Sequence, residues 1–291
     1  MSQTSIESGY SSDNCVSRSP NNFMIEKDQR KFARNFEVTD LLAESANGII
    51  YNGIHLRSGR SVVIKQIPRK IVQDYIEIDD RMVPSEIYLH FHAYAISKTV
   101  VKPIAWFEKR SSFVLVMEKV QNAIDLWKFS NTFGAIPETA VLAIFSQIFK
   151  CAEKLHNGGI AHRDFKDENI LINPETLEIK VIDFGCAEKI KENEKLKTAA
   201  GTLEYFPPEW FKYCEMDVEK STIWSLGAIL YILLTGTWDF QNGTLQRNFI
   251  AEAKISTDMK KVLDSLLCHF PSKRSSFNSI ISSDFLKIWL C

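Results

Sequence analysis

His162-Arg163-Asp164-Phe165-Lys166-Asp167-Glu168-Asn169 is a run of mostly polar and charged residues between two apolar segments. Within it, Asp164 could accept the proton of an attacking hydroxyl group, and Lys166 could neutralise a phosphate. Asn169, five residues after Asp164, could hold a metal ion. These side chains in this order predict a catalytic loop for phosphoryl transfer. A lone His-Arg-Asp would instead be interpreted as a charged surface loop.

Two further motifs follow in the order that a phosphoryl-transfer site requires. Asp183-Phe184-Gly185 comes after two short apolar segments, residues 170–172 and 180–182, so Asp183 can be aimed at the same metal ion as Asn169. Pro207-Pro208-Glu209 follows at the distance of an activation segment. Three ordered motifs at compatible spacing favour the catalytic interpretation over the surface loop.

The composition is that of a soluble protein with one large or two modest hydrophobic cores. The chain has 291 residues and a formal net charge of −1, with scattered Lys and Arg residues, so nucleic acid and membranes are poor partners. We see no secretory signal and no apolar run of membrane-spanning length. The six cysteines form no Cys-x-x-Cys pair, which argues against zinc sites and disulfides. We expect a cytoplasmic protein, with the nucleus as an alternative location.

The sequence changes character near residue 36. Residues 1–30 are rich in Ser and Asn and poor in apolar periodicity, which predicts a disordered N-terminal arm. Strand patterns broken by Gly and Ser then predict an antiparallel sheet made of residues 36–42, 49–54, 61–67, 101–107 and 113–117.

One lysine lies in an apolar strand of this predicted sheet. Lys65 follows Val62-Val63-Ile64, and a buried cation needs a partner or an anion. The helical pattern that begins near Pro84 supplies Glu86, which could face the strand. We therefore expect Glu86 to pair with Lys65 and orient it toward phosphates, the alternative being a lysine at an exposed sheet edge.

The last predicted strand of the sheet ends in a candidate nucleotide-binding segment. Met117 would close the back of a nucleotide pocket. The backbone from Glu118 to Val120 would form hydrogen bonds with the edge of adenine. Main-chain recognition of this kind explains why side-chain identity is loosely specified there.

The rest of the chain has helical patterns. A core helix is predicted from Pro137 to the glycines at 158–159, followed by helices near 257–267 and 277–289. Residues 224–234 are apolar on every face, and eleven residues are too few to span a membrane, so they predict a buried central helix. Arg274 is a candidate partner of Glu209, with a solvent-facing arginine as the alternative.

With these motifs in view, residues 36–289 resemble the eukaryotic protein kinases, and among them most of all the Pim family of serine/threonine kinases. The likeness to Pim kinases is carried by four features: the run 162–169, Gly201-Thr202 with Tyr205 and Pro207-Pro208-Glu209-Trp210, Val83-Pro84, and Trp224-Ser225-Leu226-Gly227 with Thr222 in place of the usual Asp. The resemblance implies an α+β, bilobal protein kinase fold, with a β-sheet N-lobe at 36–118 and an α-helical C-lobe at 124–289.

The resemblance also implies roles for individual residues. Asp164 would be the catalytic base and Lys166 the contact to the γ-phosphate of ATP. Asn169 and Asp183 would bind Mg²⁺, and Lys166 with Thr202 indicates Ser or Thr acceptors. Glu168 would contact basic substrate residues. The residues implied at the ATP site are Leu42, Gly48, Ile50, Val63, Lys65, Glu86, Met117, Glu118, Val120 and Asp125, the last at the ribose and substrate lip.

The sequence departs from the family pattern at five places. Residues 42–50 keep only Gly48 of three signature glycines, which weakens the predicted cradle for phosphates. Val63 replaces the usual Ala and narrows the pocket, whereas Val120 replaces a proline and restores a backbone N–H. Lys128 and Thr237 stand where the family tends to have acidic residues, which predicts a weaker preference for Arg-rich substrates.

We therefore expect a monomeric, ATP- and Mg²⁺-dependent serine/threonine kinase that acts on protein substrates with upstream basic residues. The alternative is a pseudokinase scaffold, because the Gly-rich loop is eroded. Arg163 predicts a need for a neutralising anion, since it lies beside the catalytic Asp. Phosphorylated Thr198 is the first candidate for this anion, and unmodified Glu192 or Glu194 is the alternative.

Overall fold

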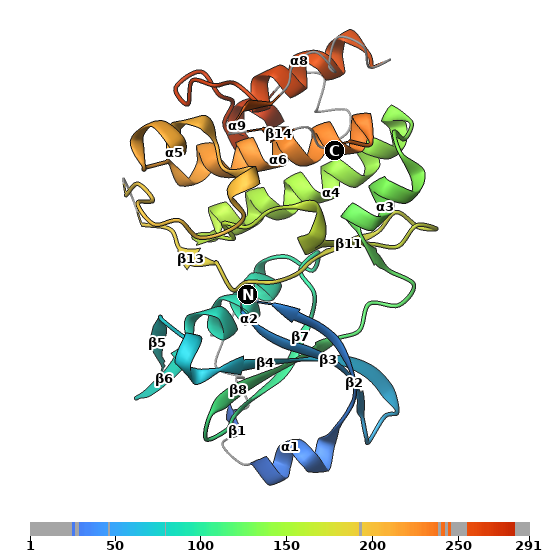
Figure 1. Cartoon of the computed structure of the whole chain (residues 1–291), viewed down its shortest axis with the longest axis vertical. Helices are drawn as coiled ribbons and strands as arrows, with labels where there is room; N and C mark the ends of the chain where they lie inside the picture. The colour runs from blue at the N-terminus through green and yellow to red at the C-terminus, as the bar shows by residue number, and fades with distance from the viewer. Residues whose placement is uncertain are drawn as a thin grey trace, which may run out of the picture.

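The computed structural model describes residues 25–26, 29–45, 47–78, 80–191, 194–237, 240–241, 244–245 and 255–282. Within them the chain has two parts, a β-sheet lobe and a helical lobe, joined by the short connection after residue 118 (Figure 1). The catalytic motifs lie on the segments between the two parts. This arrangement confirms the predicted bilobal α+β kinase fold.

The N-lobe is built on a six-stranded sheet. Its strands are arranged in the order β1-β7-β8-β4-β3-β2, and only β1 pairs in parallel, with β7. The bounds are β1 Ile25–Glu26, β2 Phe36–Ser45, β3 Gly48–His55, β4 Arg60–Pro68, β7 Pro103–Glu108 and β8 Ser112–Glu118. The five predicted strands are therefore present, with β2 extending three residues further than expected.

The N-terminal segment differs from the prediction of disorder up to residue 30. β1 pairs with β7 through Ile25 and Glu26, and helix α1 begins at Gln29 and ends at Asn35. The helix is held because Phe32 is buried, with ring centroids 5.2 Å from Phe107 and 5.9 Å from Phe36. Residues 1–24 of the predicted arm lie outside the described residues.

Helix α2, Ser85–Ile96, carries Glu86 and packs between the lobes. A 3-10 turn, η1 Arg69–Ile71, and the hairpin of β5 Tyr75–Ile78 with β6 Arg81–Pro84 precede it. Pro84 stands at the N-cap, where a missing N–H costs nothing, and Glu86 lies in the first turn, where a carboxylate is favoured by the helix dipole. The predicted helix beginning near Pro84 is confirmed.

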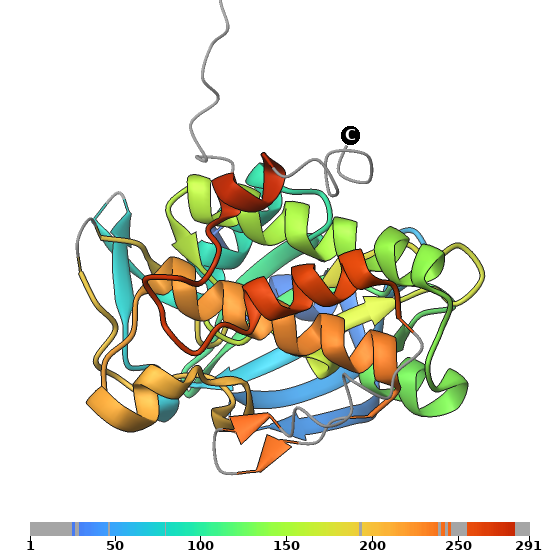
Figure 2. The ribbon, with the colours of Figure 1, turned by 90° about the horizontal axis from the view of Figure 1, so that it is seen from above.

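The C-lobe is helical around α4 and α6. The helices are α3 Leu126–Phe133, α4 Glu138–Asn157, α5 Pro208–Tyr213, α6 Val218–Thr235, α8 Thr257–Leu266 and α9 Phe277–Ile281. α6 contacts both α4 and α8, and Figure 2 shows these helices side by side. The predicted helix at 277–289 is described only as far as Ile281, and the rest lies outside the described residues.

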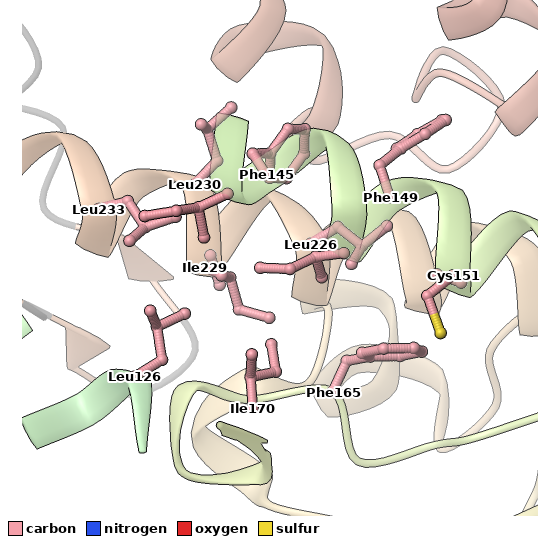
Figure 3. Close-up of a cluster of buried hydrophobic side chains, with 14 of the residues drawn as sticks. Leu126, Phe145, Phe149, Cys151, Phe165, Ile170, Leu226, Ile229, Leu230 and Leu233 are labelled. Carbon is pink, nitrogen blue, oxygen red and sulfur yellow. The ribbon is translucent and has the colours of Figure 1, made fainter. Parts of the chain in front are cut away.

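The centre of the C-lobe is an apolar core. Leu226, Ile229 and Leu230 of α6 meet Phe145 and Phe149 of α4, and all five side chains are buried (Figure 3). Burying apolar area of this kind is the main favourable term in folding. The catalytic loop rests on this core through buried Phe165 and Ile170, whose side chains point into the same cluster in Figure 3.

The prediction for α6 was right in its burial and wrong in its length. The helix has 18 residues rather than eleven, and by length and composition alone it could cross a membrane. Most of it is buried inside the lobe, as in the core helix of a soluble protein. Its burial, and not its length, therefore identifies it as a core helix.

Glu209 and Arg274 form a buried ion pair. The guanidinium donates two hydrogen bonds to the carboxylate, of 2.7 and 2.8 Å, and both side chains are almost inaccessible to solvent. Arg274 also donates to the carbonyls of Cys268 and Lys220. The predicted pairing is confirmed, and the alternative of a solvent-facing arginine is wrong.

Short strands position the catalytic segments. β9 Ile124–Asp125, β11 Ile170–Ile172 and β12 Ile179–Val181 form one small sheet, and β10 Ile160–Ala161 pairs with β13 Glu188–Lys189. The catalytic stretch runs from β10 to β11 through a 3-10 turn, η2 Asp167–Asn169. The other short elements are η3 Leu203–Tyr205 and the pair β14 Phe240–Gln241 with β15 Thr244–Leu245.

Candidate active site

A cavity of about 470 Å³ lies between the two lobes. All but one of the residues predicted at the ATP site line it, namely Leu42, Ile50, Val63, Lys65, Glu86, Met117, Glu118, Val120 and Asp125. Gly48 does not, because it packs against β4 at the tip of the β2–β3 hairpin. Leu171 also lines the cavity, and no pattern in the sequence separates it from the other apolar residues of its strand.

Lys65 is buried at one end of this cavity between two carboxylates. Its Nζ atom lies 2.5 Å from Glu86 Oε1 and 2.9 Å from Asp183 Oδ1. Burial alone would lower the pKa of Lys65, but the two anions outweigh it and raise that pKa above its ordinary value. Burial likewise opposes ionisation of Asp183, yet Lys65 holds the pKa of Asp183 below its ordinary value. The lysine is therefore a fixed cation.

Phe184 anchors the turn that carries Asp183. It is fully buried, with ring centroids 5.0 Å from His90 of α2 and 4.8 Å from His162. His90 also bonds the carbonyl of Val101 at 2.9 Å. Asp183 adopts a left-handed backbone conformation, with φ of 61°. The aromatic packing supports this strained geometry, which the sequence could not show because His90 carries no motif.

The catalytic loop is pre-assembled around Asp164. Asp164 Oδ1 accepts a 2.8 Å hydrogen bond from the backbone N–H of Thr202, and Oδ2 accepts one of 2.8 Å from Asn169 Nδ2. Lys166 Nζ lies 3.7 Å from Asp164 Oδ2 and donates to Thr202 Oγ1 at 2.9 Å. The structure thus brings together the predicted base, the phosphate contact, one metal ligand and the acceptor-facing threonine.

Gly201 makes the approach to Asp164 possible. Its φ is 106°, and a Cβ there would lie 2.4 Å from the carbonyl oxygen of Arg163 and 3.3 Å from Asp164 Oδ1. Any other residue would be strained in this conformation and would push the segment away. The glycine therefore lets the Thr202 N–H reach the catalytic carboxylate.

The predicted magnesium ligands fit a partly solvated site. Asn169 donates through Nδ2 to Asp164, so its Oδ1 atom is the one that could ligate a cation. Asp183 Oδ1 contacts Lys65 and the backbone N–H of Gly185, and within the described residues we find no protein partner for Oδ2. In the described residues no cluster of three His, Cys, Asp or Glu side chains could hold a metal by itself. Mg²⁺ suits such a site because it keeps water and phosphate ligands beside one or two protein ligands.

The hinge between the lobes offers main-chain groups to the cavity. The N–H of Glu118 donates to the Lys102 carbonyl within the N-lobe. In the described part of the chain we find no protein partner for the N–H of Val120. Met117 is buried and pairs in register with Val63 at the back of the cavity. This geometry fits the predicted contact of Val120 with the edge of adenine.

The two acidic residues expected at the substrate lip have other partners. Asp125 Oδ1 accepts from the backbone N–H of Lys128 at 2.7 Å and caps helix α3. Glu168 Oε2 lies 2.9 Å from Lys166 Nζ. Lys128 lines the same lip of the cavity. Both carboxylates keep an oxygen for substrate, but the local field is less negative than their presence alone suggests.

Arg163, beside the catalytic base, pairs with Glu188, a residue to which the sequence assigned no role. Its NH1 atom donates to Glu188 Oε2 at 2.7 Å, and NH2 donates to the Thr198 carbonyl at 2.5 Å. Of the alternatives inferred from sequence, Glu194 pairs with Lys191 instead, and Glu192 lies outside the described residues. Thr198 does lie next to the arginine, with Oγ1 at 3.3 Å.

A larger cavity, of about 790 Å³, lies between α2, the β5–β6 hairpin and the activation segment. Charged residues such as Lys189, Lys197 and Glu215 contribute to its lining. It contains neither Asp164 nor Asp183. We therefore assign the chemistry to the smaller cavity, which holds Lys65 and Asp183 and opens beside the catalytic loop.

This fold and this arrangement of Lys65, Glu86, Asp164, Asn169 and Asp183 define a protein kinase. The family model described as protein kinase domain matches residues 36–286, so the chain belongs to that family. The chain is 31% identical to the serine/threonine-protein kinase pim-2 of Danio rerio over 266 residues, covering 88% of this chain and 86% of that protein.

Two further relatives are serine/threonine-protein kinases by name. The chain is 28% identical to prk-2 of Caenorhabditis elegans over 263 residues, covering 88% of this chain and 59% of that protein. It is 29% identical to the PAS domain-containing kinase of Mus musculus over 243 residues, covering 82% of this chain and 18% of that protein. The chain is therefore a serine/threonine protein kinase, and its resemblance to Pim kinases is supported.

Proposed function

We propose that the chain is an active kinase that binds ATP with Mg²⁺ and transfers the γ-phosphate to Ser or Thr of protein substrates with upstream basic residues. The observation that carries the proposal is the geometry of Asp164, whose two oxygens are held by Thr202 and Asn169 at 2.8 Å each. A carboxylate fixed in this way is preorganised to receive a proton.

Each residue around Asp164 has a separable task. Lys65, held by Glu86, would orient the phosphates, and Lys166 would offset negative charge that develops between donor and acceptor. Bound ATP would supply the phosphoryl group, and Mg²⁺ on Asn169 and Asp183 would offset the phosphate charge. Asp164 would take the proton of the acceptor hydroxyl. Thr202, bonded to Lys166, would form the surface against which the acceptor rests.

A pseudokinase scaffold is the second candidate function, and the loop at residues 42–50 is the observation that favours it. This loop lacks two of the three signature glycines, and Glu44 adds a negative charge to it. Against this, Lys65, Glu86, Asp164, Asn169 and Asp183 are all present and assembled. A scaffold has no chemical need for the complete set.

Phosphate incorporation into a basic Ser peptide would decide between the two functions. We expect the purified chain with Mg²⁺ and labelled ATP to phosphorylate the peptide. Asp164→Asn is the matched control, because the substitution removes the proton acceptor at nearly constant volume, and it should abolish transfer while the melting temperature stays close to that of the wild type. Equal incorporation by both proteins would reject Asp164 as the base, and no incorporation by either would favour the scaffold.

The other partner assignments are also part of the proposal. We further propose a monomer located in the cytoplasm or nucleus. A formal net charge of −1 with scattered Lys and Arg residues supports a protein that works without nucleic acid or membrane. Protein substrates are the partners that the kinase family implies.

A further inference from the structure

The tip of the β2–β3 hairpin is held in place against strand β4. Ser45 pairs with Gly48 across the tip, and Ser45 Oγ donates to the Gly48 carbonyl at 3.1 Å. Gly48 has φ of 135°, and a Cβ on it would lie 2.5 Å from the carbonyl oxygen of Gln66 in β4. The hairpin therefore lies tightly against β4, and Asn47, just before Gly48, has a defined position.

The side chain of Asn47 reaches from the N-lobe to the turn that follows Asp183. A Cβ on Gly185 would lie 2.5 Å from Asn47 Nδ2, 2.9 Å from Asn47 Cγ and 3.1 Å from Asp183 Oδ1. The amide nitrogen and the Asp183 carboxylate thus lie within 3.1 Å of one point. Lys65 Nζ contacts that same carboxylate oxygen at 2.9 Å. The Asn47 amide is therefore a neighbour of the groups proposed to orient phosphates.

The side-chain amide of Asn47 can donate hydrogen bonds to a ligand. An asparagine side chain carries two N–H donors and one acceptor oxygen. Within the described residues we find no protein acceptor for the N–H groups of Asn47, which is only half-buried. Its neighbour in the loop, Glu44, is exposed and offers only acceptor oxygens when ionised. Asn47 is thus a neutral donor at the hairpin tip that could approach a polyanion without repelling it.

We propose that Asn47 is an ATP-binding residue whose side-chain amide donates a hydrogen bond to a phosphate oxygen of bound ATP. This inference rests on the proposed kinase function. Glycines in such loops let backbone N–H groups approach phosphates without a Cβ in the way, and two of the three are missing here. A side-chain donor at residue 47 replaces part of the lost cradle. The loop would then contact phosphate through a side-chain amide in place of some of the backbone N–H groups.

Calorimetric titration with adenosine and with ATP plus Mg²⁺ tests the proposal, because only ATP presents phosphates. We expect Asn47→Ala to bind ATP about tenfold more weakly, the loss of roughly one hydrogen bond to a charged group, while its affinity for adenosine stays within about twofold of wild type. Asn47→Asp should lose at least as much affinity for ATP, since it keeps the shape but adds a negative charge. Asn131→Ala, at an exposed asparagine of α3, is the matched control and should change neither affinity.

The outcomes separate this inference from the function on which it rests. Unchanged or tighter ATP binding by Asn47→Ala would overturn the role of Asn47, and tighter binding would show that the amide obstructs the site. An equal loss for adenosine and ATP would also overturn it, because the loss would then come from the shape of the loop. Failure of the wild-type protein to bind either ligand would overturn the proposed function and this inference together.

Discussion

Arg163 donates a 2.7 Å hydrogen bond to Glu188, so the cation beside the catalytic base is already paired with an unmodified carboxylate of the activation segment. The guanidinium is almost fully buried, whereas the glutamate is about a third exposed, at 5% and 37%. Thr198 contributes its backbone carbonyl, which no side-chain substitution removes, and a hydroxyl at 3.3 Å. This arrangement predicts activity without phosphorylation of the segment.

The first prediction is that Glu188→Gln lowers kcat several-fold, because it leaves the buried charge of Arg163 without an anion. The accompanying loss of stability should be about 1–2 kcal/mol, less than for a fully buried pair, since Glu188 is partly solvated. Thr198→Ala is the matched control and should keep kcat within about twofold. Steady-state kinetics on unphosphorylated protein would measure both. An inactive Thr198→Ala protein with an active Glu188→Gln protein would instead establish a phosphate switch at Thr198.

The contrast between Lys65 and Arg163 shows how much the sequence could predict. The partner of Lys65 was predictable because a buried cation needs an anion and the next helix offered Glu86 in its first turn. The partner of Arg163 depends on the pairing of β10 with β13, which places Glu188 opposite Ala161. Two-residue strands have no periodicity that could reveal such a pairing. His90 and Asn47 were missed for the same reason, because only tertiary packing brings them to the site.

The second prediction concerns the buried pair of Glu209 and Arg274. Glu209→Gln should lower the free energy of unfolding by about 3 kcal/mol, because Arg274 would keep its charge with little access to water. Urea denaturation of both proteins would measure the loss. Glu215→Gln removes one partner of the exposed pair with Lys195 and should leave the transition unchanged. Equal losses of stability from the two substitutions would show that the buried pair contributes no more to the free energy of unfolding than the exposed pair does.

The third prediction is a loss of stability in mild acid that depends on His90. Burial lowers the pKa of His90 to about 4, below its ordinary value near 6.5, with Lys65 and His162 also disfavouring the charged form and Asp183 and the Val101 carbonyl favouring it. At pH values between 6.5 and 4, His90 is therefore protonated in the unfolded chain but neutral in the folded chain. The free energy of unfolding should fall as the pH drops through this window. His90 should account for a loss on the order of 3 kcal/mol.

Urea denaturation of the wild type and a His90 variant at pH 7.5, 5.5 and 4.5 would measure the contribution of His90 to this loss. His90→Leu keeps an apolar side chain against Phe184 and should flatten the slope of stability against pH. Part of the slope should remain, because burial also lowers the pKa of His162. A variant with the slope of the wild type would contradict the assignment to His90.

The last prediction concerns the charge at the substrate lip. Asp125 and Glu168 could attract arginines upstream of the acceptor, but one oxygen of Asp125 caps α3 and Glu168 is paired with Lys166. Lys128 adds an exposed cation to the same lip. A substrate with a long run of arginines would therefore gain little over one with one or two. Exposed charges of this kind mainly tune selectivity and on-rate.

Lys128→Asp should reverse this balance. We expect kcat/KM for a peptide with three upstream arginines to rise about fivefold relative to a peptide with one, because a repulsion is replaced by an attraction at a solvated site. The gain should shrink as salt is added, since exposed charges are screened. Lys31→Asp, at an exposed lysine of α1 on the far side of the N-lobe, makes the same charge change and should leave the ratio unaltered. Equal gains from both variants would mean that the net charge of the protein, and not the charge at the substrate lip, sets the ratio. A wild-type preference for acidic or proline-directed peptides would overturn the proposed basic-substrate class.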